Sequence, residues 1–227
     1  MKYKHIVRGV FIKRPNRFIA HVQIDDKVEV CHVKNTGRCK ELLVPGATVW
    51  LEKSDNLSRK TAYDVIAVQK GERLINMDSQ LPNAVAYEWM NQQKDALGIV
   101  ELRREVTHGN SRFDIWGKMT SGKEFFVEVK GVTLEDDGVV RFPDAPTERG
   151  VKHVEELITC LSEGYGAAIL FVIQMNDVKW FEPNIKTHAA FAEVLKRAQT
   201  AGVSVKAYAC EVEPDSMRIK KEVEVRL

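Results

Sequence analysis

The sequence has no long hydrophobic run: the longest uninterrupted apolar stretch is 167–173, far below the ~20 residues that a membrane-spanning helix needs. No hydrophobic segment of the kind that directs secretion follows Lys2 and Lys4. Cysteine is scarce, and the four cysteines are scattered along the chain, which favours reduced thiols over a disulfide framework. These features predict a cytoplasmic protein that does not associate with a membrane.

Several common site motifs are also missing. The chain has no glycine-rich phosphate loop, no dinucleotide-type glycine motif and no serine-nucleophile elbow. Cys31, His32 and Cys39 lack the paired spacing of a structural zinc site. With 44% hydrophobic and 29% charged residues, disorder and fibrous structure are excluded. The 227 residues suffice for one large domain or two small ones.

The net charge is only +2, but it is unevenly distributed. The first forty residues carry ten lysines and arginines against three acidic residues, whereas residues 81–227 carry 19 against 23. A basic segment joined to an acidic one predicts binding of a polyanion such as nucleic acid. The predicted nucleic-acid contacts in the basic segment are Arg38, Lys13, Arg14, Arg17 and Lys40.

The first eighty residues predict a small barrel, because alternating apolar and β-branched residues recur between turn signals. The predicted strands are 5–13, 17–24, 27–34, 48–53 and 62–69, with one helical turn at 39–44. Five strands with a short helix after the third predict an OB-like barrel, whose exposed face and loops commonly bind nucleic acid or sugars. A sugar-binding module would give no reason for the basic excess in residues 1–40.

The pattern changes from strand to helix near residue 81, so we predict two domains, 1–81 and 82–227. Pro82 near a first turn and an apolar stripe from Val85 to Met90 predict the first helix. Further elements follow as strands 100–107, 111–119 and 124–134, helix 147–163, strand 167–173, a helix ending at Gly202, and strands 203–212 and 218–225. The fold class is α/β (α+β), with the order αβββαβ in the second domain.

One predicted hairpin carries charged residues in otherwise apolar strands. Glu128 and Lys130 lie on the same face of their strand because side chains alternate, and Asp114 interrupts the preceding strand. The three-residue loop 120–122 ends in a glycine suited to its left-handed position. Counting back from this loop places Asp114 opposite Glu128, to within one residue.

Two carboxylates facing each other across a ladder lie ~5 Å apart and repel, so a positive charge is expected between them. Mg²⁺ (or Mn²⁺) fits, because it takes hard oxygen ligands and keeps waters for a phosphate and a nucleophile. Lys130 is then expected beside the attacking water, where it stabilises charge on phosphorus. The predicted catalytic residues are Asp114, Glu128 and Lys130. A structural salt bridge of Lys130 with either carboxylate is the alternative.

The order of helix, Asp-bearing strand, E-x-K strand, helix and strand resembles the PD-(D/E)XK nuclease fold, with Phe113 in place of the motif's proline. The whole chain resembles the sugar fermentation stimulation protein A family of bacteria and archaea. The matching segments are Asn35-Thr36-Gly37-Arg38, Glu41-Leu42, Pro45-Gly46, Leu81-Pro82-Asn83, Ser111-Arg112-Phe113-Asp114, Val127-Glu128-Val129-Lys130-Gly131-Val132-Thr133-Leu134, Phe142-Pro143-Asp144-Ala145-Pro146-Thr147, Arg149-Gly150 and Lys152-His153.

This resemblance implies an OB-like N-terminal domain, a nuclease-like C-terminal domain, sequence-nonspecific DNA binding and a regulatory role in sugar (maltose) metabolism. Two functions stay open. The first is a DNA-binding protein, with RNA as an open alternative partner, that hydrolyses phosphodiesters with Mg²⁺. The second is a non-catalytic DNA-binding regulator that keeps the carboxylates for structure or metal-assisted binding. The sequence does not predict the oligomeric state.

Three further residues complete the predicted site. Glu88 lies in the helix before the hairpin, where related nucleases often place a further metal-binding acid; the alternative is a solvated helix glutamate. Arg149 and His153 share one stripe of the next helix with Glu156. We expect Arg149 and His153 to contact phosphate, with an ordinary helix surface as the alternative.

Overall fold

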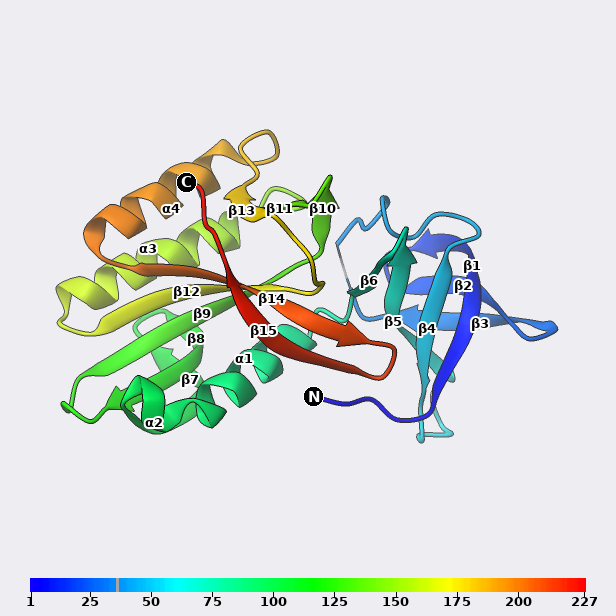
Figure 1. The fold of residues 1–227 in the computed structure, drawn as a ribbon, viewed down its shortest axis with the longest axis horizontal. Helices are drawn as coiled ribbons and strands as arrows, with labels where there is room; N and C mark the ends of the chain where they lie inside the picture. The colour runs from blue at the N-terminus through cyan, green and yellow to red at the C-terminus, as the bar shows by residue number, and fades with distance from the viewer. Residues whose placement is uncertain (36) are drawn as a thin grey trace.

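The chain forms a β-barrel at one end and a six-stranded sheet flanked by helices at the other (Figure 1). The computed structural model describes residues 1–35 and 37–227. Thr36, which belongs to the predicted turn 35–38, lies outside the described residues. Within the described ranges, no helix is both long enough and apolar enough to cross a membrane.

The barrel strands follow the order β3-β2-β1-β4-β5, and a parallel pairing of β3 with β5 closes the cylinder. This confirms the predicted five-stranded barrel. A sixth strand, β6, pairs with β5 and was not predicted. The bounds are β1 Ile6–Asn16, β2 Ile19–Ile24, β3 Lys27–Val33, β4 Thr48–Lys53, β5 Tyr63–Lys70 and β6 Arg73–Asn76.

The second sheet has the order β15-β14-β12-β9-β8-β7, with β9, β12 and β14 parallel to one another. Leaving out the short elements between them, the order α1-β7-β8-β9-α3-β12 confirms the predicted αβββαβ arrangement. The strand bounds are β7 Ile99–His108, β8 Ser111–Met119, β9 Glu124–Val132, β12 Gly166–Ile173, β14 Ser204–Glu213 and β15 Ser216–Val223. The helices are α1 Leu81–Gln92, α2 Lys94–Leu97, α3 Glu148–Ser162 and α4 Ala189–Ala201.

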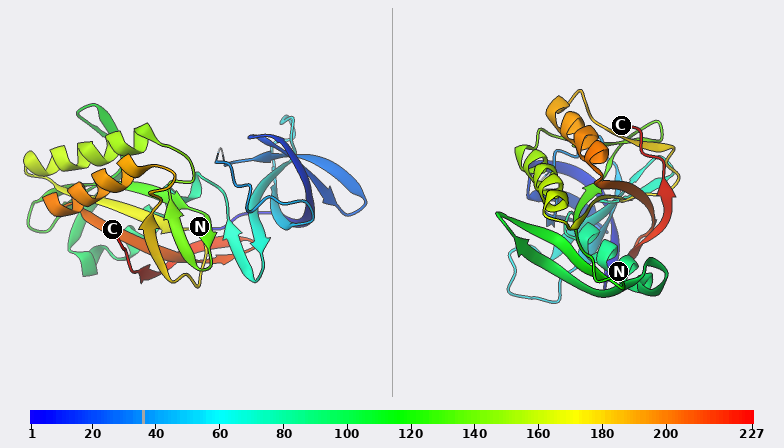
Figure 2. Two further views of the ribbon diagram at one scale, coloured as in Figure 1. Left: turned by 90° about the horizontal axis from the view of Figure 1, so that it is seen from above. Right: turned by 90° about the vertical axis from the view of Figure 1, so that its left-hand side faces the viewer.

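Helices cover both faces of this sheet. Helices α3 and α4 pack side by side over one face, and α1 packs on the other (Figures 1 and 2). Strand β12 shows the consequence for the sequence: Ile169 and Phe171 join the core under α3 and α4, whereas Leu170 and Val172 join the core under α1. A strand buried on both faces is apolar along its whole length, as β12 is.

A small third sheet was not predicted. Its strands are β10 Leu134–Asp136, β11 Val139–Phe142 and β13 Trp180–Pro183, in the order β10-β11-β13. The predicted strand 124–134 therefore ends early, at Val132, and the chain continues into β10. Strands of three or four residues show too few alternations to be recognised by periodicity.

Glu135 of β10 binds the barrel to the rest of the chain. Its buried carboxylate pairs with Lys70 Nζ at 2.7 Å and with Arg73 Nη1 at 2.8 Å, both from the β5–β6 hairpin. Burial raises the pKa of Glu135, but the hydrogen bonds and charges of its partners outweigh burial and hold the pKa below its ordinary value. The ionised form therefore stabilises this contact.

We expect Glu135→Gln to lower the free energy of unfolding by about 1–3 kcal/mol at pH 7, because two cations lose a charged acceptor. The depressed pKa makes this contribution fully present above the unfolded-state pKa, roughly 4.3, and lost as the pH falls through the lower folded-state pKa. Urea unfolding of wild type and variant at pH 7 and at low pH measures the difference. Asp136→Asn, at an exposed neighbour, is the control. A difference that does not shrink in acid would contradict this role.

Candidate metal site and basic cleft

Strands β8 and β9 pair in the predicted register. Ile115 lies opposite Val127, and the loop ends at Gly122 with φ of +86°. Beyond that pair, the Val129 amide bonds to a side chain of β8: it donates to Asp114 Oδ2 at 2.7 Å. This confirms the predicted alignment, which carries Asp114 to the position facing Glu128.

A cavity of about 270 Å³ lies where these strands separate. It is bounded by α1, β7, β8, β9 and α3, so five elements supply its walls. The lining residues are Asn83, Glu105, Arg112, Phe113, Asp114, Glu128, Val129, Lys130, Arg149 and His153. The structure thus brings together the three predicted catalytic residues and the two predicted phosphate contacts on α3.

Glu128 is the most buried acid of the cavity, with 2% of its surface exposed. Its Oε1 accepts from Lys130 Nζ at 2.5 Å and from His153 Nδ1. Burial raises the pKa of Glu128, but His153 and Lys130 outweigh burial and hold the pKa below its ordinary value. Its Oε2 is buried and accepts no hydrogen bond from any described residue. An ionised carboxylate with one unpaired buried oxygen is a suitable ligand for a cation.

The pKa of Asp114 is shifted in the opposite direction from that of Glu128. Burial, and then the negative charge of Glu128, raise the pKa of Asp114 to about 6. Asn83 Nδ2 donates to Asp114 Oδ1 at 2.6 Å, and the Val129 amide holds the other oxygen. Two carboxylates in one small cavity therefore oppose each other's ionisation, and a divalent cation would remove that opposition.

His153 forms a hydrogen bond with the Glu128 carboxylate. The Arg149 Nε–H donates to His153 Nε2 at 3.3 Å, so Nε2 acts as an acceptor and Nδ1 is the ring nitrogen left to donate. That Nδ1–H donates to Glu128. His153 is buried, whereas Arg149 is exposed. The geometry therefore places His153 where it holds the Glu128 carboxylate, and leaves Arg149 as the exposed residue of the pair.

Glu88 lies outside this cavity. Its Oε2 accepts from the amino group of Met1 at 2.7 Å. The α1 residue that faces Asp114 is Asn83, which lies roughly 140° around the helix from Glu88. Gly131 allows this approach, because a Cβ there would lie 2.6 Å from Pro82 Cγ. We therefore leave Glu88 out of the proposed metal site.

A second hollow, a cleft of about 630 Å³, collects the predicted basic residues of the barrel. Its lining residues are Phe11, Lys13, Arg14, Asn16, Arg17, Gly37, Arg38, Cys39, Lys40, Leu43, Pro45 and Ala145. Lys13, Arg17, Arg38 and Lys40 are exposed there. Four exposed cations on one concave surface create a local positive potential of the kind that attracts polyanions.

Arg14 differs from the neighbouring basic residues because its guanidinium forms hydrogen bonds with backbone carbonyl groups of the protein itself. It donates to the carbonyl oxygens of Arg17 (2.7 Å), Asn35 (2.6 Å), Gly37 (3.0 Å) and Arg38 (2.8 Å). These bonds hold the loop that presents Arg38. Arg14 therefore shapes the cleft, and sequence alone could not separate it from the exposed cations beside it.

Two family models match the chain: the sugar fermentation stimulation protein RE domain over residues 80–216, and the SfsA N-terminal OB domain over residues 12–77. The chain is 56% identical over 227 residues to the sugar fermentation stimulation protein homolog of Ruminiclostridium cellulolyticum and 54% identical over 227 residues to that of Clostridium beijerinckii, each alignment covering 100% of both chains. The solved structure of Pyrococcus furiosus SfsA in complex with Ca²⁺ superimposes with a TM-score of 0.87 at 28% identity, covering 100% of this chain and 98% of that one. The chain belongs to the sugar fermentation stimulation protein family.

Proposed function

We propose that this protein binds DNA and hydrolyses its phosphodiester bonds with Mg²⁺ or Mn²⁺ held by Asp114 and Glu128. The observation that carries the proposal is the buried, unpaired Oε2 of an ionised Glu128 beside a second carboxylate. Oxygen-only ligands suit Mg²⁺, Mn²⁺ and Ca²⁺. The Pyrococcus furiosus relative is described in complex with Ca²⁺, a cation of this class.

When bound, the cation would polarise the phosphate and lower the pKa of an attacking water. Asp114 and Glu128 would hold it, and His153 would fix Glu128 so that Oε2 stays directed at the cation. Lys130 Nζ lies 2.5 Å from Glu128 Oε1 at the cavity wall. From there its ammonium group stabilises negative charge that develops on the phosphate oxygens. Arg149 orients the phosphate from the exposed side.

The basic cleft supplies the affinity for the backbone. We propose a DNA-binding domain at 1–81 and a hydrolytic domain at 82–227. One segment contributes to both sites: Asp144 Oδ2 accepts from the Arg38 amide at 3.2 Å, and Arg149, five residues later, lines the cavity. A bound strand that follows this segment would reach both sites. Backbone contacts of this kind carry no sequence information, so binding is expected to be nonspecific.

One observation favours a second function. Lys130 and His153 already satisfy Oε1 of Glu128, so the predicted structural salt bridge exists alongside the proposed site. A regulator that binds DNA without cleaving it, in the sugar metabolism that gives the family its name, would need no more than this. Incubating purified protein with supercoiled plasmid and Mg²⁺ or Mn²⁺ separates the two functions. Metal-dependent nicking supports hydrolysis, and intact plasmid supports the regulator.

Binding by the cleft is expected to be electrostatic. The logarithm of the association constant on duplex DNA should fall with the logarithm of the salt concentration, by about 0.9 per phosphate contacted. Arg38→Ala should weaken binding to all sequences equally and reduce the slope by about one, without changing the melting temperature. Arg14→Ala should instead lower the melting temperature, because four carbonyl oxygens lose a charged donor. Fluorescence anisotropy over a salt series, with RNA as a second ligand, measures this. A slope that Arg38→Ala leaves unchanged would remove the cleft from the interface.

A further inference from the structure

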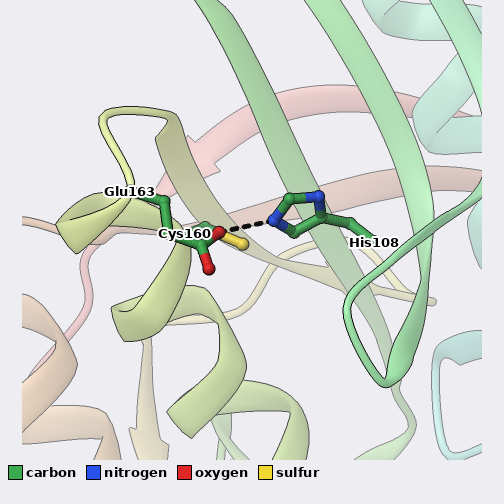
Figure 3. Close-up of side chains that lie close together, drawn as sticks. All are labelled: His108, Cys160 and Glu163. Carbon is green, nitrogen blue, oxygen red and sulfur yellow. Dashed lines mark hydrogen bonds and ion pairs between the residues drawn. The ribbon is translucent and has the colours of Figure 1, made fainter.

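A second group of metal-ligating side chains lies apart from the acidic cavity. His108 is the last residue of β7, Cys160 lies in the last turn of α3, and Glu163 caps that helix. One ligand atom from each side chain can be chosen so that all three lie within 4.8 Å of one another (Figure 3). None of the three lines the cavity that holds Asp114.

The three side chains are held in place before any ion binds. Cys160 and Glu163 are three residues apart at the end of α3, so they share a helix face. The His108 ring stacks on Phe126 at 4.8 Å between centroids and meets the edge of Tyr165 at 4.9 Å. Its Nε2 lies 2.5 Å from Glu163 Oε2. The imidazole is therefore fixed with one nitrogen directed at the helix end.

The donor atoms identify the class of ion. A sulfur, an imidazole nitrogen and a carboxylate oxygen suit Zn²⁺ or Co²⁺, whereas Mg²⁺ and Ca²⁺ prefer oxygen alone. Exposure rises from 1% for Cys160, through 28% for the His108 side chain, to 45% for that of Glu163. An ion held by all three would sit at the surface, with the sulfur beneath it and a fourth position open to water.

We propose that His108, Cys160 and Glu163 form a second cation site, selective for Zn²⁺ and similar borderline ions. The site would join the end of β7 to the end of α3. Strand β8, which follows β7 through a tight turn, carries Asp114, and α3 carries His153. A bound ion would therefore link α3, whose His153 contacts Glu128, to the β7–β8 hairpin, which carries Asp114.

A neighbouring residue supports a cation here. Glu156 lies one helical turn before Cys160, between His153 and Cys160 on the stripe 153, 156, 160 and 163 of α3. Its Oε1 lies 3.6 Å from Lys152 Nζ, whereas its Oε2 is buried and has no hydrogen-bond donor among the described residues. A second unpaired carboxylate oxygen near this end of the helix adds negative potential that a divalent cation would offset.

Cobalt titration of the metal-free, full-length protein tests the proposal. Binding through Cys160 should produce a near-ultraviolet sulfur-to-cobalt charge-transfer band that saturates at one equivalent and disappears when Zn²⁺ is added. Cys160→Ser should abolish the band. Cys210→Ser, at another fully buried cysteine, and Asp114→Asn should both retain it. His108→Gln and Glu163→Gln should each weaken Co²⁺ binding by at least about tenfold.

The proposal would be overturned if no sulfur band appeared at millimolar Co²⁺, or if the band persisted in Cys160→Ser. Zn²⁺ binding that is lost in Asp114→Asn without any sulfur signal would also overturn it, since the ion would then occupy only the acidic cavity. If Cys160→Ser does not fold, His108→Gln decides the question, because His108 is partly exposed and its replacement leaves the thiol intact. A band unaffected by His108→Gln would then reject the site.

Discussion

Glu128→Gln should abolish Mn²⁺ binding at the acidic cavity and lower DNA cleavage by at least about 10²–10³-fold, without unfolding the protein. A glutamine carbonyl can still accept from Lys130 and His153 at the position of Oε1. The amide nitrogen would replace the unpaired Oε2 and present donors in place of a lone pair. The change therefore removes the ligand and keeps the local hydrogen bonds.

Calorimetry with Mn²⁺ and a plasmid-nicking assay measure the two effects. Glu124→Gln is the matched control: Glu124 begins the same strand and accepts from Trp116 Nε1 at 3.1 Å, outside the cavity. Asp114→Asn should behave as Glu128→Gln does, since an asparagine oxygen can still accept from the Val129 amide. A Glu128→Gln protein that binds Mn²⁺ like the wild type would remove Glu128 from the metal site.

Lys130→Met should reduce cleavage by about 10²–10³-fold and leave DNA affinity within about twofold, because the two effects come from different sites. Methionine keeps most of the length and packing of the side chain but loses the ammonium group. We propose that DNA affinity arises from the cleft in the barrel, whose lining residues do not include Lys130.

Single-turnover cleavage and anisotropy on the same protein preparation separate cleavage from binding. Lys123→Met, directly before β9 in the same hairpin and outside the cavity, is the control for loss of one positive charge. Cleavage by Lys130→Met at the wild-type rate would indicate that the ammonium group takes no part in the chemistry. A parallel loss of DNA affinity would contradict the separation of the two sites.

Local patterns predicted much of the architecture. The glycine at the end of loop 120–122 fixed the register of β8 and β9, so Asp114 and Glu128 could be aligned from the sequence. The apolar run 167–173 predicted a strand, which the structure confirms as β12. Both features depend on neighbouring residues and backbone geometry, which a sequence displays directly.

Features that depend on rotation or distant contacts were missed. The rotation of α1 about its axis decides whether Asn83 or Glu88 faces the cavity, and the sequence leaves that rotation uncertain by about one residue. The internal role of Arg14 depends on four carbonyl groups of two loops. His108 and Cys160 are separated by more than fifty positions, so only the folded chain brings them together.

A crystal of the full chain grown with millimolar Mn²⁺, and measured for anomalous scattering, tests the central claim most directly. We predict one peak about 2 Å from an oxygen of Asp114 and from Oε2 of Glu128, with Lys130 and His153 still bound to Oε1. An anomalous map with no peak between these carboxylates, or with Mn²⁺ only at His108, Cys160 and Glu163, would contradict the proposed metal site.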